Sequence, residues 1–156
     1  MNVREIGRVL AIGGLLLNGG CGGSSTPSSP SAPAPTPVPT PTTATILTGT
    51  FVGLERLTFR PFDFAAGTAG TITATANWTF ATNDVDIFVT SGNTCQTFSD
   101  AGVPTGAGCT ILCQDAAVGG TKASCTFNAT SGNARLLVVN FGPTAESGTY
   151  LVTVTR

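Results

Sequence analysis

The strict alternation of apolar and polar residues in GTITATANWTF, residues 70–80, most constrains what this chain can fold into. A period of two is that of a half-buried β-strand and not of a helix. One face of the predicted strand would be covered by threonine and asparagine. The opposite face would carry the apolar side chains Ile72, Ala74, Ala76, Trp78 and Phe80.

Three later segments extend the strand pattern to the end of the sequence. DVDIFVT (84–90) alternates, with Val85, Ile87 and Val89 opposite the two aspartates, and GTYLVTVTR (148–156) alternates again. ARLLVVNF (134–141) is apolar on both faces, as expected of a central strand covered on both sides.

An earlier predicted strand, LERLTFRPFDF (54–64), changes parity at Arg60-Pro61, which indicates a bulge or a sheet edge. Its inward-facing residues would be Leu57, Phe59, Phe62 and Phe64. Because no amphipathic helical period of useful length is present, the sequence predicts an all-β domain, an antiparallel β-sandwich over residues 46–156.

Charge and composition exclude several functions. The 156 residues carry a net charge of −1, no basic cluster and no histidine. A nucleic-acid partner is therefore not expected. Without histidine the chain cannot form a Ser-His-Asp or Cys-His catalytic group, and we expect no enzyme activity.

The first 20 residues are predicted to be an export signal. Arg4 and Arg8 precede the apolar stretch VLAIGGLLL, residues 9–17. Nine residues are too few to span about 30 Å of hydrocarbon, so a signal peptide is favoured over a transmembrane helix. The following residues, NGGCGGSS, resemble the lipobox of bacterial lipoproteins, with Asn18 in place of the usual leucine. The resemblance implies cleavage before Cys21 and its acylation with fatty acids such as palmitate. Because Gly22 is not the aspartate that retains such lipoproteins at the inner membrane, it also implies the outer membrane in a cell with two membranes.

Residues 21–45 are predicted to be a linker. Five prolines occupy every second position in PAPTPVPTP, residues 33–41. Proline fixes φ and donates no hydrogen bond, so an extended polyproline II spacer is expected.

Four cysteines remain in the predicted sandwich: Cys95, Cys109, Cys113 and Cys125. An even set in an exported domain predicts two disulfides, for which three connectivities exist. Local closure favours Cys95–Cys109 and Cys113–Cys125. A zinc site is the alternative, but the spacings lack paired C-x2-C motifs.

Asp84 and Asp86 stand out in a chain with few charges, and three roles are open to them. A catalytic pair lacks surrounding acids or histidine. Calcium ligation would use Asn83, Asp84 and Asp86, although no D-x-D-x-D-G loop is present. We favour a structural role, in which Asn and Asp bond local backbone N–H groups and Asp86 bonds a neighbouring one.

The aromatic residues bear on a binding role. Trp78 and Tyr150 fall on the apolar faces of their strands and are expected in the core. Phe88, beside the two aspartates, and Phe98, within the cysteine-bounded loop, are the surface candidates for binding.

Taken in order, Trp78, NDVDIFV (83–89) and SGTYLVTV (147–154) resemble the bacterial pre-peptidase C-terminal domain. That resemblance implies a jelly-roll-like, non-catalytic sandwich, usually appended to exported enzymes, with relatives that bind matrix polymers or calcium. We expect an envelope-anchored accessory module that binds a polymer or a protein. The alternatives are a purely structural lipoprotein and a calcium-stabilised carbohydrate-binding module.

Overall fold

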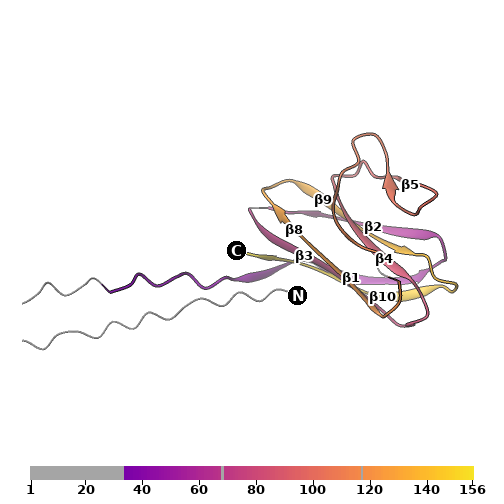
Figure 1. Ribbon diagram of the computed structural model, residues 1–156, viewed down its shortest axis with the longest axis horizontal. Helices are drawn as coiled ribbons and strands as arrows, with labels where there is room; N and C mark the ends of the chain where they lie inside the picture. The colour runs from indigo at the N-terminus through magenta and orange to yellow at the C-terminus, as the bar shows by residue number, and fades with distance from the viewer. Residues whose placement is uncertain (1–33, 68, 117) are drawn as a thin grey trace, which may run out of the picture. The chain divides into compact units, whose positions relative to one another are not determined.

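Two antiparallel four-stranded sheets, A and B, pack face to face in the computed structural model, which describes residues 34–67, 69–116 and 118–156 (Figure 1). Sheet A comprises β1 (Thr43–Leu54), β10 (Glu146–Thr155), β3 (Gly70–Trp78) and β8 (Lys122–Ala129), in that order across the sheet. Sheet B comprises β2 (Thr58–Ala65), β9 (Asn133–Asn140), β4 (Val85–Ser91) and β7 (Ile111–Asp115). A small hairpin, β5 (Thr97–Phe98) and β6 (Pro104–Thr105), interrupts the passage from β4 to β7.

The strand order is that of a jelly roll. Along the chain the strands cross repeatedly between the sheets, and β10 ends between β1 and β3. This arrangement confirms the predicted all-β, antiparallel sandwich of jelly-roll type.

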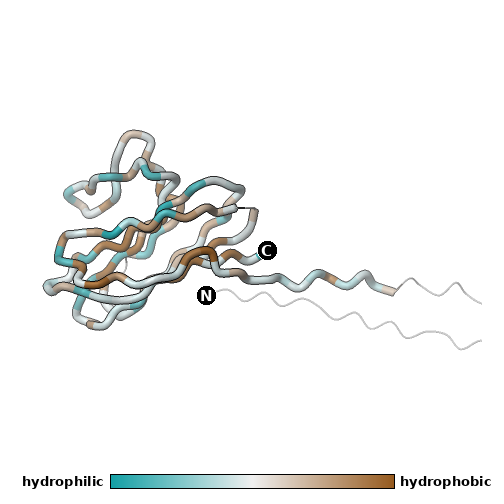
Figure 2. The backbone as a smooth tube through the Cα atoms, turned by 180° about the vertical axis from the view of Figure 1, so that it is seen from behind, coloured by the Kyte–Doolittle hydropathy of each residue, from teal (hydrophilic) through white to brown (hydrophobic). Residues whose placement is uncertain are grey.

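The core between the sheets is formed by the apolar faces that the alternation predicted. Trp78 and Tyr150 are buried in it, as expected. Phe80 was wrongly assigned to this face, since it is 53% exposed. The reason is that β3 ends at Trp78, after which the chain turns toward β4. Hydrophobic residues accordingly concentrate along the strands and hydrophilic ones in the loops (Figure 2).

The predicted parity change in β2 is absent: the strand is a sheet edge, one of the two predicted alternatives, and contains no bulge. β2 pairs with β9 in unbroken register, and Pro61 lies on this outermost strand of sheet B. Phe62 and Phe64 pack toward the core, whereas Phe59 lies on the opposite face, beside Val139. Leu57 was predicted to face inward, and this was wrong: it lies in the turn before β2 and is 64% exposed.

Both predicted disulfides are present, with the locally closed connectivity. Cys113 and Cys125 join β7 to β8, the edge strands of the two sheets, and so close one side of the sandwich. Cys95 and Cys109 join the two ends of the segment that carries the β5–β6 hairpin.

The predicted signal peptide and Cys21 lie outside the described residues. Residues 34–42 are exposed and form no regular secondary structure, and β1 starts at Thr43, slightly before the predicted boundary of the sandwich. Over the described ranges, no helix has the length and apolarity to cross a bilayer.

Candidate functional site

A buried carboxylate, Glu146, organises the turn between β3 and β4. Its oxygens accept hydrogen bonds from the backbone N–H groups of Thr79 (3.3 Å), Phe80 (3.0 Å) and Ser147 (2.8 Å). Asn83 Nδ2 donates a further bond of 2.8 Å. Burial alone would raise the pKa of Glu146, but these donors stabilise the charged form and hold the pKa below its usual value. Glu146 therefore has the structural role that was predicted for the aspartates.

Asn83 is committed to the same turn at both ends of its side chain. Its Oδ1 accepts hydrogen bonds from the Thr144 backbone N–H (3.3 Å) and the Thr144 hydroxyl (3.0 Å). With Nδ2 donating to Glu146, the amide joins the β3–β4 turn to the β9–β10 loop. This geometry makes Asn83 a structural residue and leaves Asp84 and Asp86 as the candidate cation ligands.

Asp86 does not bond a neighbouring N–H through Oδ1, which is buried without a hydrogen-bond partner, as is Asp84 Oδ1. The reason is that Asp86 lies on β4 opposite Val139 of β9, where the backbone donors of both strands are used in the sheet. Desolvation, together with the negative charges of Asp84 and Asp115, raises the pKa of Asp86 to about 7.

A cation site around Asp84 and Asp86 would be sparsely liganded. Within the described part of the chain, no group of three or more Asp, Glu, Cys or His side chains is placed to hold a metal ion. Calcium prefers about six to eight oxygens. Calcium binding stays a prediction, supported by the two carboxylate oxygens without hydrogen-bond partners, Asp84 Oδ1 and Asp86 Oδ1.

The prediction that Phe88 is a surface residue for binding is wrong, because Phe88 is only 1% exposed. It packs with Leu137, Val139 and Cys95 in a second apolar cluster on the outer face of sheet B. The segment between Cys95 and Cys109 covers this face, with β5 beside β2, β9 and β4 in Figure 1. The covered outer face also explains why β9 is apolar on both sides, as the sequence predicted.

Phe98 lies at the edge of this covering segment and is half-buried. Its ring centroid is 5.0 Å from that of Phe59 and 6.2 Å from that of Phe88. It thereby links the hairpin to the sheet, and its remaining exposed surface faces a groove.

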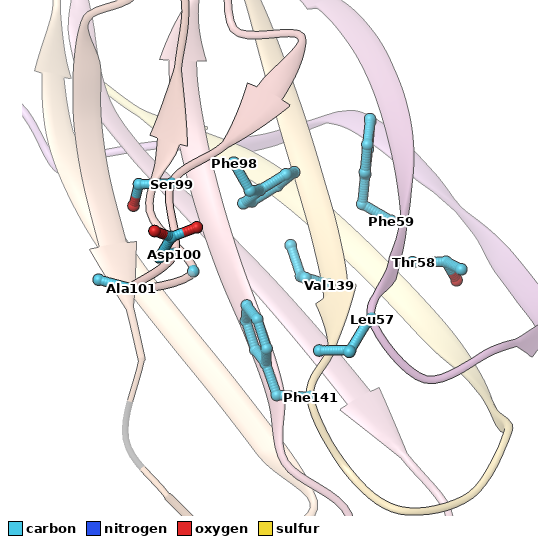
Figure 3. A pocket seen from close by; sticks show the side chains of 10 residues that line it. Leu57, Thr58, Phe59, Phe98, Ser99, Asp100, Ala101, Val139 and Phe141 are labelled. Atoms are coloured by element: carbon cyan, nitrogen blue, oxygen red, sulfur yellow. The ribbon is translucent and has the colours of Figure 1, made fainter.

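The groove has a volume of about 320 Å³ and separates the hairpin from the β1–β2 turn. Figure 3 shows Phe98, Val139 and Phe141 between the hairpin residues Ser99, Asp100 and Ala101 on one side and the turn residues on the other. Its complete lining is Leu57, Thr58, Phe59, Phe98, Ser99, Asp100, Ala101, Gly102, Val139 and Phe141.

Leu57 has a positive φ of 57°, a conformation that is costly for a leucine. Hydrogen bonds hold the turn in this shape: the Leu57 N–H donates to Asn140 O (2.7 Å), and the Thr58 hydroxyl donates to Glu55 O (2.7 Å). The strained turn places an exposed apolar side chain at the rim of the groove.

Sequence reasoning identified Phe98 but missed the other groove residues and Glu146. The side chains of Leu57 and Phe59 were expected to face the core because both are apolar and two positions apart on a predicted strand. Phe141 follows a strand that is apolar on both sides, and this two-sided pattern was the available signal for a covered outer face.

The outer face of sheet A has a different character, since it is covered by hydroxyl groups in rows across the four strands. Cross-strand bonds join Thr43 to Thr155 (2.9 Å) and Thr75 to Ser124 (3.2 Å). Lys122 is the one charged member of these rows. From β1 to β8 the rows read Thr43, Thr155, Thr71, Asn128; Thr45, Thr153, Thr73, Thr126; Thr48, Leu151, Thr75, Ser124; and Thr50, Thr149, Asn77, Lys122.

Fold and site together define a disulfide-bonded jelly-roll sandwich with one aromatic groove on its hairpin-covered face. No protein-family model matches the chain. No curated protein matches it either.

Proposed function

We propose that this protein is a non-catalytic, envelope-anchored lipoprotein whose sandwich acts as an interaction module for a polymer or a protein. The groove beside Phe98 is the observation that supports it. Concave apolar sites with a few polar groups at the rim are the usual form of binding sites. The anchor would be Cys21, attached to the outer membrane in a cell with two membranes, and the linker would hold the domain away from the bilayer.

The resemblance to the pre-peptidase C-terminal domain agrees with a role of this kind, because such domains accompany exported enzymes without catalysing a reaction. A structure fixed by two disulfides also suits exposure outside the cytoplasm. The proposal is therefore tested by substitutions at the groove.

The test compares two exposed apolar side chains, one inside and one outside the groove. Leu57 is 64% exposed at the groove rim, and Val52 is 75% exposed on β1, outside the groove lining. Purified full-length protein would be sedimented with isolated envelope polymers and tested against envelope proteins. We expect Leu57→Lys to abolish binding and Val52→Lys to preserve it. Binding that is absent, or equally strong in both variants, would contradict the proposal.

A purely structural lipoprotein is the second candidate, and the hydroxyl-covered face of sheet A favours it. Hydroxyl groups that bond one another across strands have less capacity left for a ligand. A calcium-stabilised carbohydrate-binding module is the third, supported by the two carboxylate oxygens without partners. Melting temperatures with calcium and with a chelator separate it from the others, since a ligand held by the native state raises stability.

A further inference from the structure

We infer that the groove binds an alkylated ammonium group, such as the trimethylammonium group of choline. This inference rests on the proposed binding role of the same groove and gives the chemical class of the bound group. It depends on three features of the lining: its aromatic rings, its charge and its rigid frame.

Three phenylalanine rings dominate the lining: Phe59, Phe98 and Phe141. The face of an aromatic ring carries partial negative charge, and a cation within about 6 Å of it is attracted. Aromatic cages recognise quaternary ammonium groups in this way. A volume of about 320 Å³ accepts a small headgroup or side chain and is near the lower limit for ligand sites.

The charge of the lining selects the sign of the ligand. Asp100 is the one charged residue lining the groove, and none of the lining residues is a lysine or arginine. Asp100 lies exposed in the hairpin tip, on the same side of the groove as Ser99 in Figure 3. A carboxylate beside aromatic rings attracts a cation and repels phosphate or carboxylate ligands.

Alkylation of the ammonium group is required by the apolar walls. A primary ammonium is compact and strongly hydrated, and the walls formed by Leu57, Val139 and the rings offer no acceptors, so its three donors would depend on Asp100, Ser99 and Thr58 alone. Methyl groups on the nitrogen replace those donors with apolar contacts and leave the charge in place. The lining therefore suits a methylated cation better than a lysine side chain.

The frame of the groove is fixed before any ligand binds. The Cys95–Cys109 disulfide ties the ends of the hairpin segment. Within its tip the Ser99 N–H donates to Val103 O (2.9 Å), and the Gly102 N–H donates to Ser99 O (2.9 Å). Gly102 lies so close to Phe141 that an added Cβ would come within 2.7 Å of the ring. A preorganised site loses less entropy on binding.

The experiment titrates the full-length protein with choline and with 3,3-dimethylbutan-1-ol, its neutral isostere in which carbon replaces nitrogen, and follows backbone amide NMR shifts. We expect shifts at groove residues and choline affinity at least about tenfold above that of the isostere, a difference of about 1.4 kcal/mol. Phe98→Leu, which keeps apolar volume but removes the ring, should weaken choline binding about tenfold. Phe80→Leu is the matched control, because Phe80 is exposed outside the groove.

Asp100→Asn should weaken choline binding severalfold and leave binding of the neutral isostere unchanged. Equal affinity for choline and the isostere would overturn the ammonium assignment and leave the binding role of the groove intact. Absence of choline binding, combined with polymer or protein binding that depends on Leu57, would also overturn the ammonium assignment and leave the binding role intact. Failure of the sedimentation test would instead remove the proposed function.

Discussion

Replacing Asp86 by asparagine should stabilise this protein at neutral and alkaline pH. Asp86 is 8% exposed, its Oδ1 has no hydrogen-bond partner, and desolvation, together with the negative charges of Asp84 and Asp115, raises its pKa to about 7. Asparagine has a similar shape and no charge. The substitution therefore removes the cost of holding an ionised group in this position.

The sign of the pH dependence follows from the direction of the pKa change. Since the folded pKa lies above the ordinary value of 3.8, the native protein binds the Asp86 proton more tightly than the unfolded chain. Its contribution to stability is complete below about pH 3.8 and is lost as the pH rises through about 7. Asp86→Asn should accordingly match the wild type near pH 4 and exceed it near pH 8.

The magnitude has an upper limit set by the same pKa. A rise from 3.8 to about 7 corresponds to about 4 kcal/mol. Solvent at the remaining exposed surface of Asp86 screens part of the repulsion, and the asparagine amide needs a hydrogen-bond partner of its own. We therefore expect a gain of about 1–2 kcal/mol near pH 8.

Urea denaturation of the oxidised wild type and of Asp86→Asn, at about pH 4 and about pH 8, measures this difference. Asp86→Ala serves as a second variant that removes the charge without adding an amide. An equal loss of stability for Asp86→Asn at both pH values would refute the reasoning, since it would reveal a hydrogen bond to the carboxylate. A calcium-dependent gain in the wild type that both variants abolish would instead establish Asp86 as a cation ligand.

Three further predictions address the frame and the anchor. Glu146→Ala should lower the free energy of unfolding by about 3–5 kcal/mol, because four hydrogen-bond donors lose their acceptor. In the wild type, the stabilisation from Glu146 should be present above its ordinary pKa of 4.5 and be lost as the pH falls through its lower folded pKa, which an acid titration followed by circular dichroism would detect. Cys95→Ser/Cys109→Ser should cost about 3 kcal/mol by urea denaturation and weaken ligand binding at the groove, whereas an unchanged groove would show that the hairpin needs no covalent tie. Cys21→Ser should abolish metabolic labelling with a clickable fatty acid, and labelling that survives the substitution would contradict lipid anchoring.

The sequence predicted those parts of the structure that depend on strand periodicity and cysteine spacing. Strict alternation placed Ile72, Ala74, Ala76 and Trp78 in the core, because a period of two permits one buried face. The disulfides followed from an even cysteine set with two short loops. Alternation failed where the chain leaves the sheet, as at Phe80 and Leu57, since periodicity does not indicate where a strand ends.

The roles of the carboxylates could not be assigned from local sequence. Asp84 and Asp86 attracted attention as neighbours on one strand, yet Glu146, far away in the sequence, accepts the hydrogen bonds of the β3–β4 turn. A pair separated by 63 positions, Asn83 and Glu146, is joined only by the tertiary fold. Composition and spacing contain no signal for such a contact.

The two-sided apolar character of β9 connects the groove to the unusual carboxylate. A strand buried on both faces requires a cover on its outer side, and the segment between Cys95 and Cys109 provides that cover over Leu137, Val139 and Phe88. The same outer face carries Asp86, which pairs with Val139 in register, so the carboxylate lies beside an apolar cluster and away from water. Covering this face therefore buries Phe88 and forms one wall of the aromatic groove with Phe98, and we infer that it also limits the access of water to Asp86. Because these consequences share one cause, loosening the hairpin should open the groove and lower the pKa of Asp86 toward its ordinary value together.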